Sequence, residues 1–256
     1  MPGQVLYEQP LNERMRIFLR LEHLMQRINI FLQGQDRLAT HGAITTLIEL
    51  FSLSTRGDLK SELMKELERQ IANLNRLEHD PEVDQSRLST VIEKQRHLIT
   101  KLHSMSGQLG QELKENDFLN AIRQRMSVPG GTCDFDLPAY HYWLNRPVDE
   151  RHAQIKQWNQ PFIQVEEAIS QILELIRDSA IPEMRIASKG FYQQALDSNR
   201  PYQLIRILLP EDVAHFPEIS AGKHRFSVRF LELGNLDERS HQIDYDVEFL
   251  LACGTL

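Results

Sequence analysis

The spacing of apolar residues changes at about residue 182 of this 256-residue chain, and the change restricts the folds open to it. From about residue 12 to 180, apolar side chains recur every three or four positions, which is the period of an amphipathic helix. Beyond residue 182 they alternate with polar side chains, which is the period of a half-buried strand. Helices followed by an antiparallel sheet are typical of the α+β class.

We therefore predict a mainly helical domain over residues 1–181 and a β-sheet domain over residues 182–256. Residues 4–8 also look extended and could add a strand to that sheet. Asp58 is a good N-cap for a helix, and Pro161 breaks or restarts the helical pattern because it lacks a backbone donor. The predicted helices cover 12–32, 43–54, a segment starting at Asp58, 84–105, 111–126, 138–145 and an apolar repeat over 155–176. We expect the third and fourth of these to form a long helical hairpin.

The predicted strands lie at 202–209, 225–233 and 243–251, with another around 184–192. Alternation places Lys223, Arg225, Ser227 and Arg229 on one face of their strand, while His224, Phe226, Val228 and Phe230 share the other. One face is therefore suited to burial and the other to a negatively charged partner. That partner is either inside the chain or on another molecule.

An internal partner is available in the last predicted strand, where Asp244, Asp246 and Glu248 share a face. If the strands at 225–233 and 243–251 form a hairpin through residues 234–242, Arg229 faces Asp246 as a cross-strand ion pair. This register leaves Lys223 and Arg225 beyond the acidic residues. Both an internal and an external partner for Arg229 remain open at this point.

A second set of basic residues lies in the first predicted helix. Arg16, Arg20, His23 and Arg27 are spaced by four, three and four positions, which places them along one helix face. Such a stripe is typical either of an anion-binding surface or of an ordinary solvated face. The pattern by itself does not name the anion.

Composition narrows the classes of function. A formal net charge of −7 argues against a nucleic-acid-binding protein, and the absence of a long apolar run predicts a cytoplasmic protein without direct membrane insertion. Two cysteines without a paired motif favour reduced thiols, and we predict no metal, no cofactor and no catalytic residue. An enzyme that uses Cys133 and His141 is one alternative, because a thiol and an imidazole can form a nucleophile and its base. A nucleic-acid-binding protein is the other alternative, because of the arginine stripes, although the acidic net charge argues against it.

Five segments spread along the chain also carry a family resemblance. They are QVLYEQPLNERMRIFLRLE, TRGDLKSELMKELERQ, VDQSRL, IRQRMSVPGGTCDFDLPAYHYWL and PEISAGKHRFSVRF. Together they resemble the ZapD family of bacterial cell division proteins, from about Gln4 to Cys253.

This resemblance implies a function that the motifs do not give. It implies a non-enzymatic factor of septation that binds the C-terminal tail of the tubulin-like GTPase FtsZ and bundles its filaments, which stabilises the Z-ring at midcell. It further implies a homodimer with two tail sites, which can hold two filaments at once.

The resemblance also implies which residues hold the tail, which in the family contains acidic and apolar residues. The residues implied are Arg56 in TRGDLK and Arg225 and Arg229 in KHRFSVRF, with Arg20 in RMRIFLRLE as an addition from the basic helix stripe. Lys223, at the entry to the same strand, completes the predicted binding residues. Arginine suits this role because its planar guanidinium binds a carboxylate through two hydrogen bonds.

Overall fold

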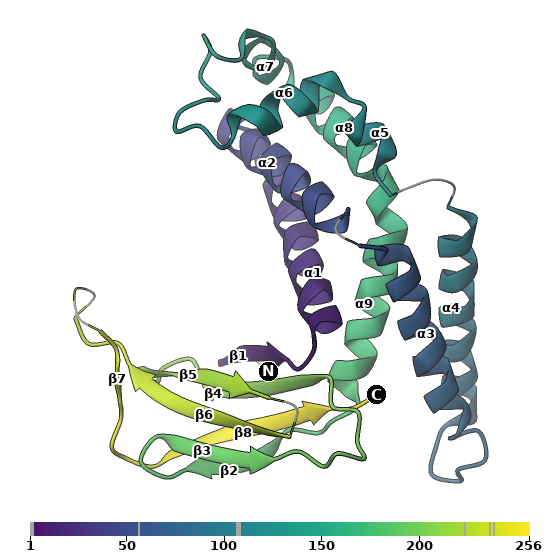
Figure 1. Cartoon of the computed structure of the whole chain (residues 1–256), viewed down its shortest axis with the longest axis vertical. Coiled ribbons are helices and arrows are strands. Elements are labelled where there is room, and N and C mark those ends of the chain that lie inside the picture. The colour runs from purple at the N-terminus through teal and green to yellow at the C-terminus, as the bar shows by residue number, and fades with distance from the viewer. Residues whose placement is uncertain (1–2, 56, 106–108, 223, 236, 238) are drawn as a thin grey trace. The chain divides into compact units, whose positions relative to one another are not determined.

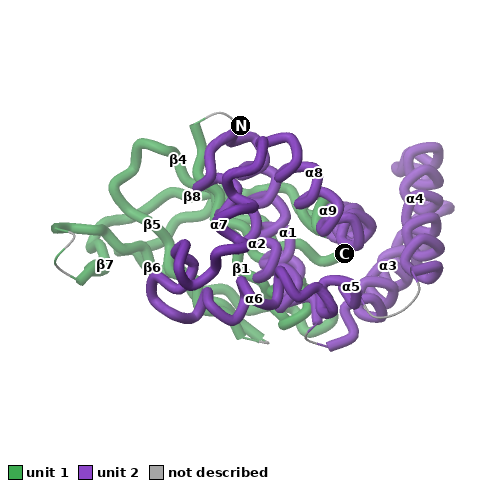
Figure 2. Tube along the Cα trace, turned by 90° about the horizontal axis from the view of Figure 1, so that it is seen from above, with its two compact units in different colours: residues 1–16, 173–256 green, residues 17–172 purple. Residues whose placement is uncertain are grey.

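The computed structural model of the chain forms two compact units, which Figure 2 shows in two colours. Unit 1 consists of residues 1–16 and 173–256, and unit 2 of residues 17–172. The structure describes residues 3–55, 57–105, 109–222, 224–235, 237 and 239–256. Helices dominate the N-terminal part and antiparallel strands the C-terminal part, so the predicted α+β class is confirmed (Figure 1).

The helices follow the apolar periods of the sequence closely, with two differences. They are α1 (Glu13–Phe31), α2 (Arg37–Ser54), α3 (Leu59–Asn75), α4 (Gln85–Ser104), α5 (Gln111–Lys114), α6 (Asp117–Arg125), α7 (Pro138–Leu144), α8 (Val148–Asn159), the 3-10 turn η1 (Gln160–Phe162) and α9 (Ile163–Asp178). The helix α2 begins earlier than predicted, because Asp36 caps it by accepting a hydrogen bond from the Ala39 N–H. The single helix predicted over 111–126 is wrong, because Asn116 interrupts it and caps α6 instead.

Local signals account for several other helix boundaries. Asp58 and Asp84 cap α3 and α4 through their side chains, as the sequence indicated for Asp58. Pro161 lies in η1 and separates α8 from α9, so the predicted break is confirmed. The helices α3 and α4 form the predicted hairpin, in which the buried Gln95 side chain donates to Gln70 Oε1 at 2.7 Å.

Unit 1 contains two antiparallel sheets. Its strands are β1 (Gln4–Pro10), β2 (Glu183–Ala187), β3 (Phe191–Ala195), β4 (Leu204–Pro210), β5 (His215–Ala221), β6 (Arg225–Glu232), β7 (His241–Gln242) and β8 (Val247–Gly254). Sheet A has the order β1-β4-β8-β2, and sheet B has the order β3-β6-β5 with β7 beside β6. The extended segment at the N-terminus thus pairs with β4 at the edge of sheet A.

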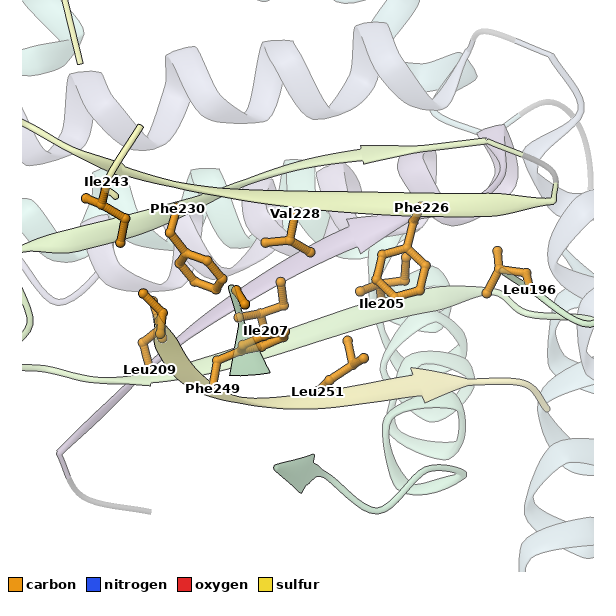
Figure 3. Packing of buried hydrophobic residues seen from close by; sticks show 12 residues of the cluster. Leu196, Ile205, Ile207, Leu209, Phe226, Val228, Phe230, Ile243, Phe249 and Leu251 are labelled. Atoms are coloured by element: carbon orange, nitrogen blue, oxygen red, sulfur yellow. The ribbon is translucent and has the colours of Figure 1, made fainter. Parts of the chain in front are cut away.

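The inner faces of the two sheets share one apolar core. Phe226, Val228 and Phe230 of β6 point towards side chains of β4 and β8, as Figure 3 shows. The rings of Phe230 and Phe249 lie 5.1 Å apart between their centroids. Because strand side chains alternate, burial of these three residues turns the intervening residues of β6 outwards.

The strands differ in two places from arrangements that the sequence left open. The strands β6 and β8 do not form a hairpin, because β6 belongs to sheet B and β8 to sheet A. The segment around 184–192 is not one strand but two, since it turns back between β2 and β3. Gly190 makes this turn possible with a φ of +68°, and a Cβ atom there would lie 2.6 Å from Ile243.

Candidate functional site

The outer face of sheet B carries the basic residues that the sequence placed on one side of a strand. Arg225 and Arg229 are exposed on β6, and Ser227 between them is half-buried. The two arginines are four positions apart along the strand, so their Cα atoms lie about 13 Å apart. The apolar core behind β6 holds this strand in place, so the two arginine side chains extend from fixed points on the same face of the sheet.

The register of sheet B defines the neighbours of each arginine. Ala195 of β3 is the cross-strand partner of Arg225. Arg229 lies between Phe191 of β3 and Glu218 of β5. Phe191 is 40% exposed, so an apolar ring stands beside a cation on the same face. This face therefore offers contacts for both acidic and apolar groups.

A shallow depression of about 310 Å³ opens on this face. Its lining comes from all three main strands of sheet B: Gln193, Ser220, Ala221, Gly222, Arg225, Phe226 and Ser227. Gln193, Ser227 and Ser220 are directly opposite one another across the strands, and their polar groups can donate and accept hydrogen bonds. Arg225 and the hydroxyl groups of Ser220 and Ser227 are part of this lining, which suits a polar or acidic chain segment.

Neither arginine is neutralised within the part of the chain that the structure describes. No described side chain forms an ion pair or hydrogen bond with the Arg225 or Arg229 guanidinium, although Glu218 lies across from Arg229 in the register. An exposed, unpaired guanidinium keeps its five donors available to a partner. The surface is thus suited to binding carboxylates, which an arginine contacts through two parallel hydrogen bonds.

The internal ion pair between Arg229 and Asp246, which the sequence left open, is not formed among the described residues. Asp246 precedes β8 of sheet A, and its Oδ1 accepts a hydrogen bond from the Lys189 backbone N–H at 2.8 Å. It therefore stabilises the turn between β2 and β3. Arg229 is left without this internal partner.

Arg20 lies in unit 2, on the basic stripe of α1. Two members of this stripe are already paired within the chain, because Arg16 binds Glu13 at 2.5 Å and Arg27 binds Glu49 at 3.1 Å. Arg20 and His23 are exposed. A role for Arg20 in the same binding site as the sheet arginines stays a prediction. Arg56 and Lys223 lie outside the described residues.

The structure shows the surroundings of the two residues of the alternative catalytic pair. The Cys133 thiol donates to Asp136 Oδ2 at 3.4 Å, and Asp136 in turn lies 3.5 Å from Arg125. His141 is exposed on α7 and shares no hydrogen bond with Cys133 among the described residues. A search of the same residues finds no group of His, Cys, Asp and Glu that could hold a metal ion.

The length and the apolar content of the described helices decide whether any of them could cross a membrane. None of them combines the length and the apolar content that crossing a bilayer would require.

Sequence reasoning missed the residues that surround the two arginines. Glu218 and Ser220 come from β5, while Phe191 and Gln193 come from β3. The alternation in Phe216-Pro-Glu-Ile-Ser220, directly before the turn at Gly222, was a usable signal for a hairpin of β5 and β6. The position of β3 had no local signal, because its register with β6 is set by a long-range contact.

The fold and this face define an α+β protein with a surface suited to binding an acidic segment. Comparison with known proteins supplies the family. The ZapD family model, described as a cell division protein, matches residues 19–229. Similar proteins, each named cell division protein ZapD, occur in Methylococcus capsulatus at 41% identity over 98% of both chains and in Coxiella burnetii at 39% identity over 97% of both chains. A third from Cupriavidus pinatubonensis is 43% identical over 96% of this chain and 98% of its own. The chain belongs to the ZapD family of cell division proteins.

Proposed function

We propose that this protein binds the C-terminal tail of FtsZ and, as a homodimer, cross-links FtsZ filaments into bundles that stabilise the Z-ring. It acts in the cytoplasm at the division site and catalyses no reaction. The observation that carries this proposal is the exposure of Arg225 and Arg229 on the outer face of sheet B, where neither has an ion-pair partner among the described residues. Family membership supports a role in cell division.

The chemistry of this face matches a tail that contains acidic and apolar residues. Carboxylates are bound by guanidinium groups through charge-assisted hydrogen bonds. Apolar side chains have Phe191 beside Arg229 as an anchor. A sheet face with these features can hold an extended peptide.

Cross-linking requires two tail sites on one particle. A homodimer provides them, and a filament presents many tails, so that a second binding event follows the first at a high effective concentration. A monomer with one site would coat filaments without joining them. The dimer is therefore part of the proposal, and sedimentation equilibrium of the purified chain measures it directly.

The test is co-sedimentation and light scattering of FtsZ with GTP, with and without the full-length protein. We expect bundling by the wild type and its loss on Arg225→Glu. Binding of a synthetic FtsZ tail peptide to this variant should weaken by roughly tenfold or more, because a hydrogen bond to a charged group contributes about 1.5–3 kcal/mol.

Arg96→Glu is the matched control, because Arg96 is exposed on α4 and the substitution changes the charge by the same amount. It should leave both peptide affinity and bundling unchanged. Absence of bundling by the wild-type dimer at near-physiological salt would refute the proposal. An equal loss of peptide affinity and bundling in both variants would refute the placement of the site on sheet B.

A further inference from the structure

The two edges of sheet B differ in their capacity to accept another strand. Among the strands that the structure describes, β3 and β5 each pair with β6 on one side, which places them at opposite edges of the sheet. An edge strand presents unpaired N–H and C=O groups that can bind an extended peptide. Which edge is open depends on which residues point their backbone groups outwards.

The hydrogen-bond pattern of β3 identifies its outward groups. Phe230 N–H donates to Gly190 C=O at 2.8 Å, and Leu196 N–H donates to His224 C=O at 2.8 Å. In an antiparallel pair the bonded residues alternate, so Tyr192 and Gln194 also face β6. The N–H and C=O groups of Gln193 and Ala195 therefore point away from β6, towards the free edge.

The same reasoning shows that the edge of β5 is blocked. Gly222 N–H donates to Arg225 C=O at 2.9 Å, so Ser220 and Glu218 also face β6, and Pro217 faces the free edge. Proline has no N–H to donate, and it is one of the devices by which native sheets prevent strand addition. The β5 side also carries the carboxylate of Glu218, which repels an acidic peptide.

The edge of β3 has the opposite character. Ala195 is the small neighbour of Arg225, so it leaves room for the arginine side chain to reach across β3. A strand added beside β3 would lie two strand spacings, about 10 Å, from β6. Its carboxylates on the outer face would then meet the guanidinium groups of Arg225 and Arg229.

We propose that the acidic tail binds by adding a strand to the free edge of β3, where Gln193 and Ala195 supply backbone hydrogen bonds and Arg225 and Arg229 bind its carboxylates. This inference rests on the proposed function for the identity of the peptide. It assigns recognition to two parts: the backbone bonds select an extended conformation, and the arginines select acidic side chains at an even sequence spacing. Side chains at even spacing share one face of a strand.

The first experiment uses the full-length wild-type protein and synthetic FtsZ tail peptides that carry a single N-methyl group at each position in turn. An N-methyl group removes one backbone donor without altering the protein. Strand addition predicts that affinity falls at alternate positions, by about fivefold or more for each bond lost, with much smaller effects at the positions between. A loss of affinity that does not alternate between successive peptide positions would overturn the inference.

The second experiment measures hydrogen exchange of the protein with and without saturating unmodified peptide. The N–H groups of Gln193 and Ala195 should exchange at least about tenfold more slowly in the complex, because they become bonded. Ile219 and Ala221, whose backbone groups face the free edge of β5, are the internal controls and should not change. Slowing at the β5 residues instead would overturn the assignment of the edge.

A pair of matched variants completes the test. Ala195→Pro removes a donor from the β3 edge, and Ala221→Pro removes one from the β5 edge. We expect at least a fivefold loss of peptide affinity for the first and none for the second. The peptide experiments decide the question if either variant fails to fold. The peptide could bind in an Arg225-dependent way without alternating N-methyl effects and without slower exchange of the β3 N–H groups. That result would overturn strand addition and leave the proposed function intact. No binding to the wild type would overturn both.

Discussion

Replacing Glu218 by Gln should increase the affinity for an acidic tail. Glu218 and Arg229 are directly opposite each other on β5 and β6. A tail strand beside β3 lies about 15 Å, or three strand spacings, from β5, so a tail carboxylate that reaches back towards Arg229 lies on the order of 12 Å from the Glu218 carboxylate. The Glu218 side chain therefore repels the ligand that its neighbour attracts.

Coulomb's law gives the size of this repulsion. Two unit charges about 12 Å apart in water interact with about 0.35 kcal/mol, which corresponds to a change in affinity of about 1.8-fold. At an ionic strength of about 0.15 M the Debye length is about 8 Å, and the change in affinity falls to about 1.1-fold. The expected gain for Glu218→Gln is thus about 1.8-fold at low salt and about 1.1-fold at physiological salt.

Fluorescence anisotropy of a labelled FtsZ tail peptide, titrated at both ionic strengths, measures this gain. Glu248→Gln is the matched control, because Glu248 is an exposed residue of sheet A and the substitution removes the same charge. The control should change affinity by much less than Glu218→Gln. Unchanged or weaker binding of Glu218→Gln at low salt would refute the placement of a tail carboxylate beside Arg229, as would an equal gain in the control.

Three further predictions concern stability and reactivity. Glu8→Gln should lower the free energy of unfolding by about 3 kcal/mol in chemical denaturation, because Glu8 is mostly buried between Arg177 at 2.8 Å and Arg206 at 3.3 Å; a loss under about 1 kcal/mol would contradict this. Burial lowers the pKa of His215 below its ordinary value of 6.5, so the folded protein binds fewer protons than the unfolded chain and its stability should fall as the pH drops below about 6.5. Denaturation of His215→Phe at about pH 7.5 and pH 5.5 should show a smaller loss than the wild type, and an equal loss would count against the assignment. Burial raises the pKa of the Cys253 thiol to about 11, so alkylation followed by mass spectrometry should be slow at neutral pH; a rate like that of a free cysteine would exclude this burial in solution.

Much of the fold could be predicted from the sequence because local signals determine it. Asp58 and Asp84 cap helices because their side-chain oxygens accept hydrogen bonds from backbone N–H groups of the first turn. Pro161 marks the helix break because it lacks a backbone N–H. Alternation correctly placed Arg225 and Arg229 on the face opposite Phe226 and its apolar neighbours. In each case the deciding interaction involves residues only a few positions apart.

Strand pairing could not be predicted in the same way. Alternation assigns a residue to a face, but it is equally compatible with any partner strand whose apolar residues have the same period. In the sequence, the acidic face before and along β8 looked complementary to the basic face of β6. The two strands nevertheless belong to opposite sheets, and the apolar core lies between them. Ile243 N–H donates to Phe230 C=O at 3.2 Å, which holds the connection beside β6 before the chain enters sheet A. Charge complementarity between two strands is a weak guide, because exposed pairs contribute at most about 1 kcal/mol.

The proposed binding mode has a consequence for bundling. Gln193 and Ala195 offer a few backbone hydrogen bonds, each of which contributes about 1 kcal/mol net, and exposed charge pairs add little more, so a single tail should bind weakly. Weak sites cross-link filaments when they act in pairs, because the second tail binds at a high effective concentration. A cross-link needs both sites of a homodimer, so a substitution that weakens each site tenfold should reduce doubly bound dimers by up to about a hundredfold. Bundling should therefore fall more steeply than peptide affinity when Arg225 is replaced, and a parallel decline would mean that one strong site dominates.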